Sequence, residues 1–78
     1  MKEGDRVQLN ITDREPWAFG TVDKINGRSG FIEKIRPLEH TFFAEGRTVL
    51  VQFDEPIPDE FSGELTGFWM LPEELTFL

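Results

Sequence analysis

Glycine and proline divide this chain of 78 residues into short segments, so its fold cannot be built on long helices. Seven glycines and five prolines are spread along the sequence. The longest stretches without them are rich in β-branched and aromatic residues, which favour strands. Short apolar segments separated by turn residues roughly every eight to twelve positions predict a small all-β barrel.

The alternation of apolar and polar residues locates the clearest strands. Residues 6–11 (RVQLNI) and 48–53 (TVLVQF) each place three apolar side chains on one face, as a half-buried strand does. These side chains are Val7, Leu9 and Ile11 in the first segment and Val49, Val51 and Phe53 in the second. Residues 67–71 (GFWML) and 75–78 (LTFL) predict two further strands. Between them, Pro72 and the two glutamates that follow it predict a short 3₁₀ turn.

The middle of the chain contains two similar segments, GTVDKI at residues 20–25 and GFIEKI at residues 30–35. The Asn26-Gly27 pair between them is a strong turn signal, so we expect two neighbouring strands of a hairpin. The sequence therefore predicts one domain, residues 1–78, that forms a single small barrel of about five short antiparallel strands.

The formal net charge of −7 lies entirely after Arg47. Residues 1–47 contain eight acidic and eight basic residues, whereas the remainder contains seven acidic residues and no Lys, Arg or His. These acids are Asp54, Glu55, Asp59, Glu60, Glu64, Glu73 and Glu74. One interpretation is a solvated surface that favours solubility. The other is a docking surface for a basic partner, because opposite charges raise association rates and select partners.

Direct binding to nucleic acid or to a membrane is disfavoured by the acidic pI of about 4.5. A basic stretch does exist, and it has the aromatic neighbours that small barrels use to bind single strands. It comprises Lys24, Arg28, Lys34, Arg36 and Arg47, with Phe42 and Phe43 nearby. Four acids lie among these bases and offset their charge, namely Asp23, Glu33, Glu39 and Glu45.

Catalysis is not expected. His40 is the single histidine, there is no cysteine, and both serines lie in glycine-containing turns. Nucleophilic catalysis needs a nucleophile, a positioned base and an orienting group, and this chain offers one possible centre at most. No phosphate-binding or dinucleotide-binding glycine motif is present, so we expect no cofactor. Pro56 and Pro58 interrupt the acid spacing that a calcium loop requires, so we also expect no metal.

The chain is expected to be a soluble, cytoplasmic protein. Its lack of cysteine fits a reducing compartment. No apolar run approaches the roughly 18 residues of a membrane span, and the first residues lack the apolar stretch of a signal peptide.

The two tryptophans are candidates either for the core or for a binding surface. Trp17 follows Pro16 at the end of a loop, where binding residues are common. Trp69 is the better interface candidate, because in a strand Phe68 and Met70 lie on the face opposite to it.

The order of the motifs resembles that of the SH3-like small barrels of bacteria. The matching segments are GDRVQL near the start, FGTVDKI and SGFIEKI in the middle, TVLVQFDEP, and the closing FWMLPEELTFL. Within that group, FDEP at residues 53–56 and LPEEL at residues 71–75 are most similar to CarS-type antirepressors, which are acidic and imitate DNA. The resemblance implies contact residues at Asp54, Glu55, Glu73 and Glu74. A general likeness to the small peripheral barrel subunit of photosystem I is also visible.

These observations predict a non-enzymatic protein-binding module or inhibitor that docks a basic, DNA- or RNA-binding protein through an acidic, DNA-mimicking surface. The expected binding residues are Asp54, Glu55, Asp59, Glu60, Glu64, Glu73 and Glu74, with Trp69 as an apolar anchor. Two alternatives remain open. One is an accessory subunit of a larger complex that docks through apolar contacts, and the other is a nucleic-acid binder that uses residues 24–47.

Overall fold

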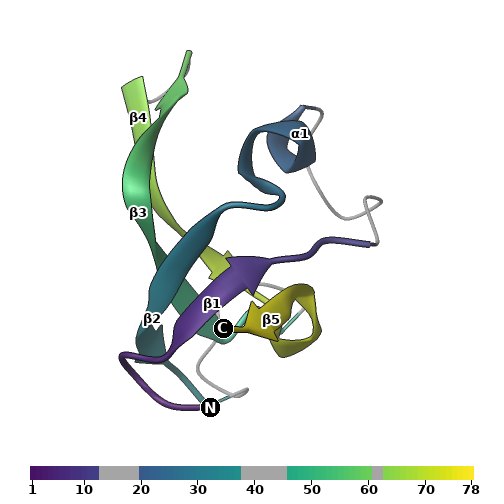
Figure 1. Cartoon of the computed structure of the whole chain (residues 1–78), viewed down its shortest axis with the longest axis vertical. Coiled ribbons are helices and arrows are strands. Elements are labelled where there is room, and N and C mark those ends of the chain that lie inside the picture. Colours follow the sequence, from purple (N-terminus) through teal and green to yellow (C-terminus); the bar gives the residue numbers. More distant parts are fainter. Residues whose placement is uncertain (13–19, 38–45, 61–62) are drawn as a thin grey trace.

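The computed structural model describes residues 1–12, 20–37, 46–60 and 63–78 and consists mainly of one antiparallel sheet (Figure 1). The sheet contains five strands in the order β4-β3-β2-β1-β5. Their bounds are β1 Arg6–Leu9, β2 Ser29–Ile35, β3 Val49–Asp59, β4 Gly63–Met70 and β5 Leu75–Phe77. Helix α1 spans Thr21–Ile25, and the 3₁₀ turn η2 spans Pro72–Glu74. The predicted all-β fold of about five short antiparallel strands with a 3₁₀ turn near the C-terminus is confirmed.

The core lies on one face of the sheet, and alternation along the strands fills it. The three apolar side chains predicted on each of the first two strand segments are all buried. The core is completed by Ile32, Ile57, Met70 and Leu75 from the sheet and by Val22 and Ile25 from α1. Met70 is opposite Val49, and Phe68 is opposite Val51 and packs against the core. Trp69 is therefore on the outward face, opposite the half-buried Leu50.

Strand β3 is longer than predicted and continues through both prolines to Asp59. The β2–β3 pairing ends at Gly30 and Phe53, so beyond Phe53 strand β3 pairs only with β4. Pro56 and Pro58 each lack a backbone N–H, but they lie beyond the last β2–β3 pair, so no hydrogen bond to β2 is lost there. The register between β3 and β4 shifts between Gln52 and Ile57, where the longer β3 segment bends. The result is a two-stranded projection, the β3–β4 arm (residues 54–60 and 63–65), which rises above the rest of the sheet (Figure 1).

The prediction that residues 20–25 form a strand is wrong, because Thr21–Ile25 is a helical turn. Val22 and Ile25 are three positions apart, so a strand would point them to opposite faces, whereas a helix places both on one side. Both side chains are buried, and burial of the pair favours the helix. The predicted turn follows it. Asn26 (φ −62°, ψ 135°) and Gly27 (φ 83°) form a type II turn, closed by the Arg28 N–H donating to the Ile25 carbonyl at 3.1 Å.

Within the part of the chain that the structure describes, no helix has the length and apolar character needed to cross a membrane.

Candidate functional site

The β3–β4 arm brings together five of the eight predicted binding residues: Asp54, Glu55, Asp59, Glu60 and Glu64. Four of them follow one another along β3 and its turn. Glu64 joins them from β4, because the antiparallel register sets it opposite Pro58. A hairpin thus brings acids from two sequence positions onto one projecting element.

Lys24 of α1 offsets part of the charge at the tip of the arm. Its ammonium lies 3.1 Å from a carboxylate oxygen of Asp59 and 4.0 Å from one of Glu60. The side chain of Asp59 is only 11% exposed, whereas that of Glu60 is 77% exposed. Asp59 therefore joins α1 to the arm, and Glu60 presents its charge to solvent.

Arg6 offsets the charge of Asp54 at the base of the arm. Its two guanidinium nitrogens donate to the two carboxylate oxygens of Asp54 at 2.5 and 2.6 Å, the bidentate geometry of a strong charge-assisted pair. These hydrogen bonds and the positive charge of Arg6 lower the pKa of Asp54. Beside this pair, Asp54 and Glu55 line a hollow of about 220 Å³ with Arg28, Ser29 and Phe53. This hollow has charges of both signs in its wall.

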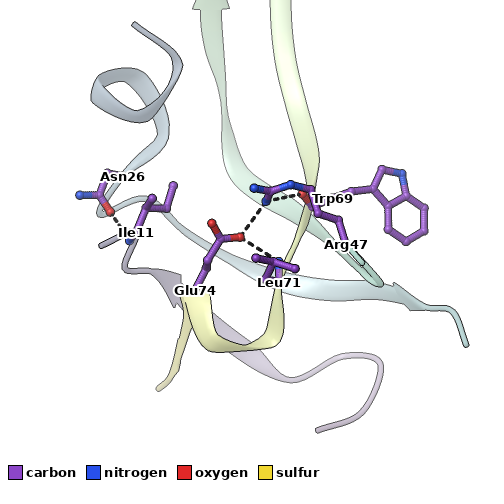
Figure 2. Close-up of polar contacts among 6 residues, drawn as sticks. All are labelled: Ile11, Asn26, Arg47, Trp69, Leu71 and Glu74. Atoms are coloured by element: carbon purple, nitrogen blue, oxygen red, sulfur yellow. Dashed lines mark hydrogen bonds and ion pairs between the residues drawn. The ribbon is translucent and has the colours of Figure 1, made fainter. Parts of the chain in front are cut away.

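Glu74 lies in the interior, not on the predicted acidic surface (Figure 2). One of its carboxylate oxygens accepts from Arg47 at 2.7 Å and from the Leu71 backbone N–H at 2.8 Å. The side chains of Arg47 and Glu74 are only 4% and 7% exposed. Glu74 therefore holds η2 against the start of β3 and presents no charge to a partner.

Glu73 is exposed on η2, at the end of the molecule away from the β3–β4 arm (Figure 1). The two glutamates that the LPEEL motif offered as contacts thus differ in environment, since one is at the surface and the other is buried. Neither lies beside Asp54 and Glu55.

Trp69 belongs to a second surface. Its indole points away from the buried Arg47–Glu74 pair (Figure 2), and the guanidinium of Arg36 lies 4.8 Å from the ring centroid. With Leu50, Gly67 and Phe68 it lines a mainly apolar hollow of about 300 Å³. Trp69 and Glu64 are five positions apart on one strand, about 17 Å at the rise of an extended chain. The predicted apolar anchor is therefore separate from the acids of the arm.

Sequence reasoning missed the basic partners of the acids. Arg6 and Asp54 are 48 positions apart, Lys24 and Asp59 are 35 apart, and Arg47 and Glu74 are 27 apart. No local spacing rule connects residues at these separations, so only the strand order could have paired them. Trp17 and His40 lie outside the described residues. Among the residues that the structure does describe, no three acidic or histidine side chains are grouped as a metal site requires.

A scan against protein-family models, a search of curated proteins and a search of solved structures each find no match for this chain.

Proposed function

We propose that this protein is a non-enzymatic binding module or inhibitor that docks a basic, nucleic-acid-binding protein through the β3–β4 arm. The observation that carries the proposal is the gathering of five acids on a projecting two-stranded element. Lys24 and Arg6 offset part of this charge, and Glu55, Glu60 and Glu64 are exposed.

The density of charge on the arm supports imitation of a nucleic-acid strand. Residues 54–60 span at most about 20 Å in extended conformation and carry four acids, about one carboxylate every 5 Å, and Glu64 lies beside them on β4. Each strand of DNA carries one charge about every 3.4 Å along the helix axis. A site on a partner that binds phosphates with Lys and Arg would meet carboxylates at a somewhat wider spacing, with Asp54 and Asp59 already paired to Arg6 and Lys24. A partner held in this way cannot hold its nucleic acid at the same site.

A matched pair of variants tests the arm while keeping its two closest ion pairs, Arg6–Asp54 and Lys24–Asp59. The arm variant carries Glu55→Gln, Glu60→Gln and Glu64→Gln, and the control carries Glu3→Gln, Glu33→Gln and Glu73→Gln. Both change the net charge by the same amount, and the control changes exposed acids outside the arm. Immobilised wild-type protein first captures partners from nuclease-treated lysate. A captured basic protein is then purified, and its affinity for each variant and its competition with DNA or RNA are measured.

We expect the arm variant to bind at least about ten-fold more weakly than the control, because charges that steer association act through a local field. Binding should weaken as salt rises, since the Debye length is only about 8 Å at physiological ionic strength. Nucleic acid should displace the protein from its partner. Equal binding by both variants and insensitivity to salt would contradict the proposal and favour an accessory subunit held by apolar contacts.

A further inference from the structure

The outward face of the sheet carries a different set of side chains from the arm. Two rows cross the strands there, because residues directly opposite each other in neighbouring antiparallel strands project to the same side. The first row is Lys34, Leu50 and Trp69, and the second is Arg6, Phe31, Gln52 and Gly67. Arg36 adds a third cation beside Trp69.

Three cations belong to this face in a chain whose net charge is −7, namely Arg6, Lys34 and Arg36. Among the ion pairs of the described residues, the one that includes these rows is Arg6–Asp54, in which two guanidinium nitrogens of Arg6 donate to the carboxylate. Of the four acids that offset the basic stretch in the sequence, Asp23 belongs to α1 and Glu33 to β2, and Glu39 and Glu45 lie outside the described residues.

Aromatic rings and a side-chain amide lie between these cations. Trp69 forms one wall of the 300 Å³ hollow, and Gly67 leaves its floor without a side chain. The amide oxygen of Gln52 lies next to that floor, since a Cβ on Gly67 would be 3.5 Å from it. Phe31, which is 37% exposed, is opposite Gln52 in the register. The face therefore offers two rings, a hydrogen-bonding amide and a rim of positive charge.

We propose that this face binds a short segment of single-stranded nucleic acid. A base would stack in the hollow against Trp69, the Gln52 amide would bond to a base edge, and Lys34 and Arg36 would contact phosphates. Single-strand binding combines stacking on aromatic residues with a cationic track. Charge complementarity selects a polyanion, and the rings select one with flat bases. The inference is independent of the proposed docking of a basic protein, which uses the β3–β4 arm.

The experiment uses a fluorescein-labelled oligothymidine of about ten nucleotides, within the range of site sizes known for single small barrels. Trp17→Phe leaves Trp69 as the single tryptophan, so quenching of its fluorescence reports stacking directly. Anisotropy of the label gives the affinity. Because the net charge of the protein opposes binding, we expect a Kd of roughly 10⁻⁵ to 10⁻⁴ M at low salt.

Three variants test the contacts. Trp69→Leu should weaken binding at least about five-fold, the lower end of the effect of removing one stacking ring. Lys34→Gln and Arg36→Gln should each lower the slope of affinity against salt by about 0.7, the value for one phosphate contact with a single strand. Lys24→Gln is the charge-matched control, because Lys24 contacts the arm. Lys24→Gln should change the affinity less than about two-fold, because salt screens the effect of a charge that lies far from the bound phosphates.

Two further probes decide between charge alone and recognition of bases. Inorganic polyphosphate carries the charge of the oligonucleotide without its bases, and a glutamate-rich peptide containing phenylalanine carries negative charge with a different ring. The proposal is supported if the oligonucleotide quenches the fluorescence of Trp69 and stays bound when either probe is added in excess. It is overturned if the oligonucleotide does not bind, if polyphosphate binds equally well, or if the peptide alone binds. Should Trp69→Leu fail to fold by circular dichroism, the Lys34 and Arg36 variants decide the outcome.

Discussion

At the scale of single residues, Arg47 and Glu74 form the most consequential contact in the described part of the chain. Their side chains meet at 2.7 Å in the interior, and the same glutamate oxygen accepts the backbone N–H of Leu71. Removing one member of a buried ion pair leaves the other charge without compensation in a medium that solvates it poorly. Removing one member of the pair should therefore destabilise the fold by more than the intact pair stabilises it.

We predict that Glu74→Gln lowers the free energy of unfolding by about 3–5 kcal/mol, the usual cost of breaking a buried pair. Urea denaturation measures it. The neighbouring Glu73→Gln is the control and should change stability by less than about 0.5 kcal/mol, because Glu73 is exposed. The double variant Arg47→Met with Glu74→Gln should recover part of the loss. If Glu74→Gln is as stable as the control, the pair is not closed in solution.

The Arg6–Asp54 pair gives a prediction for pH. Hydrogen bonds from Arg6 lower the pKa of Asp54 in the folded protein. A carboxyl with a depressed pKa in the folded state contributes stability above its unfolded pKa of about 3.9 and loses that contribution as pH falls through the folded value. Arg6→Gln should therefore be less stable than the wild type at pH 7, and the difference should shrink as pH falls through the lowered pKa of Asp54.

The direct check is a carbon-detected NMR titration of the Asp54 carboxyl. Its midpoint should lie below about 3.9 in the wild type and return toward that value in Arg6→Gln. An Asp54 midpoint that Arg6→Gln leaves unchanged would show that the pair does not form in solution.

At the scale of elements, two glycines allow β2 and β4 to approach β3 closely on its two sides. A Cβ on Gly30 would lie 2.1 Å from the Gln52 carbonyl oxygen, and one on Gly67 would lie 2.7 Å from the Val51 carbonyl oxygen. Both contacts involve backbone atoms, which cannot move aside as a flexible side chain can. The close approach occurs where β3 begins to bend toward the arm.

We predict that Gly30→Ala and Gly67→Ala each lower the free energy of unfolding by about 1–3 kcal/mol, as overpacking does. Gly30→Ala should be the more damaging because its contact is shorter. In a domain of this size, each kcal/mol lowers Tm by about 4–8 °C, so thermal melts resolve the effect. Thr66→Ala on exposed β4 is the control. If the two glycine variants melt at the same temperature as the control, then β2, β3 and β4 can move apart enough to accommodate a Cβ at little cost in stability.

At the scale of the whole molecule, the two halves of the chain complement each other in charge. Bases from residues 1–47 pair with acids from the remainder at the base of the arm, at its tip and in the interior. These contacts leave a net charge of −7, which opposes compaction. Exposed ion pairs contribute only about 0–1 kcal/mol each, so long-range repulsion should exceed them.

Raising sodium chloride from about 20 mM to about 500 mM should therefore raise Tm by a few degrees, because salt screens the mutual repulsion of the excess acids. Differential scanning calorimetry measures the shift. Sodium fluoride at the same ionic strength controls for specific ion effects. A Tm that falls with salt would show instead that the exposed ion pairs dominate.

Much of the fold could be predicted from the sequence. Alternation located the buried faces of β1 and β3, and the 3₁₀ turn and the strand after it were expected from Pro72 and the residues that follow. Such features depend on neighbours within a few positions, and side-chain periodicity records them. The acids of the arm were also visible, because they are close in sequence.

Tertiary structure decided the features that depend on distant residues. Residues 20–25 have a strand-like composition, but burial of Val22 and Ile25 against the sheet makes them helical. Glu73 and Glu74 are neighbours in the motif, yet only the fold sets Glu74 against Arg47 in the interior. The sequence by itself determined the alternation that forms β1 and the first part of β3, and how much charge lies before and after Arg47. Pairing between strands, which joins residues far apart in the chain, determined where those charges lie and which face Trp69 presents.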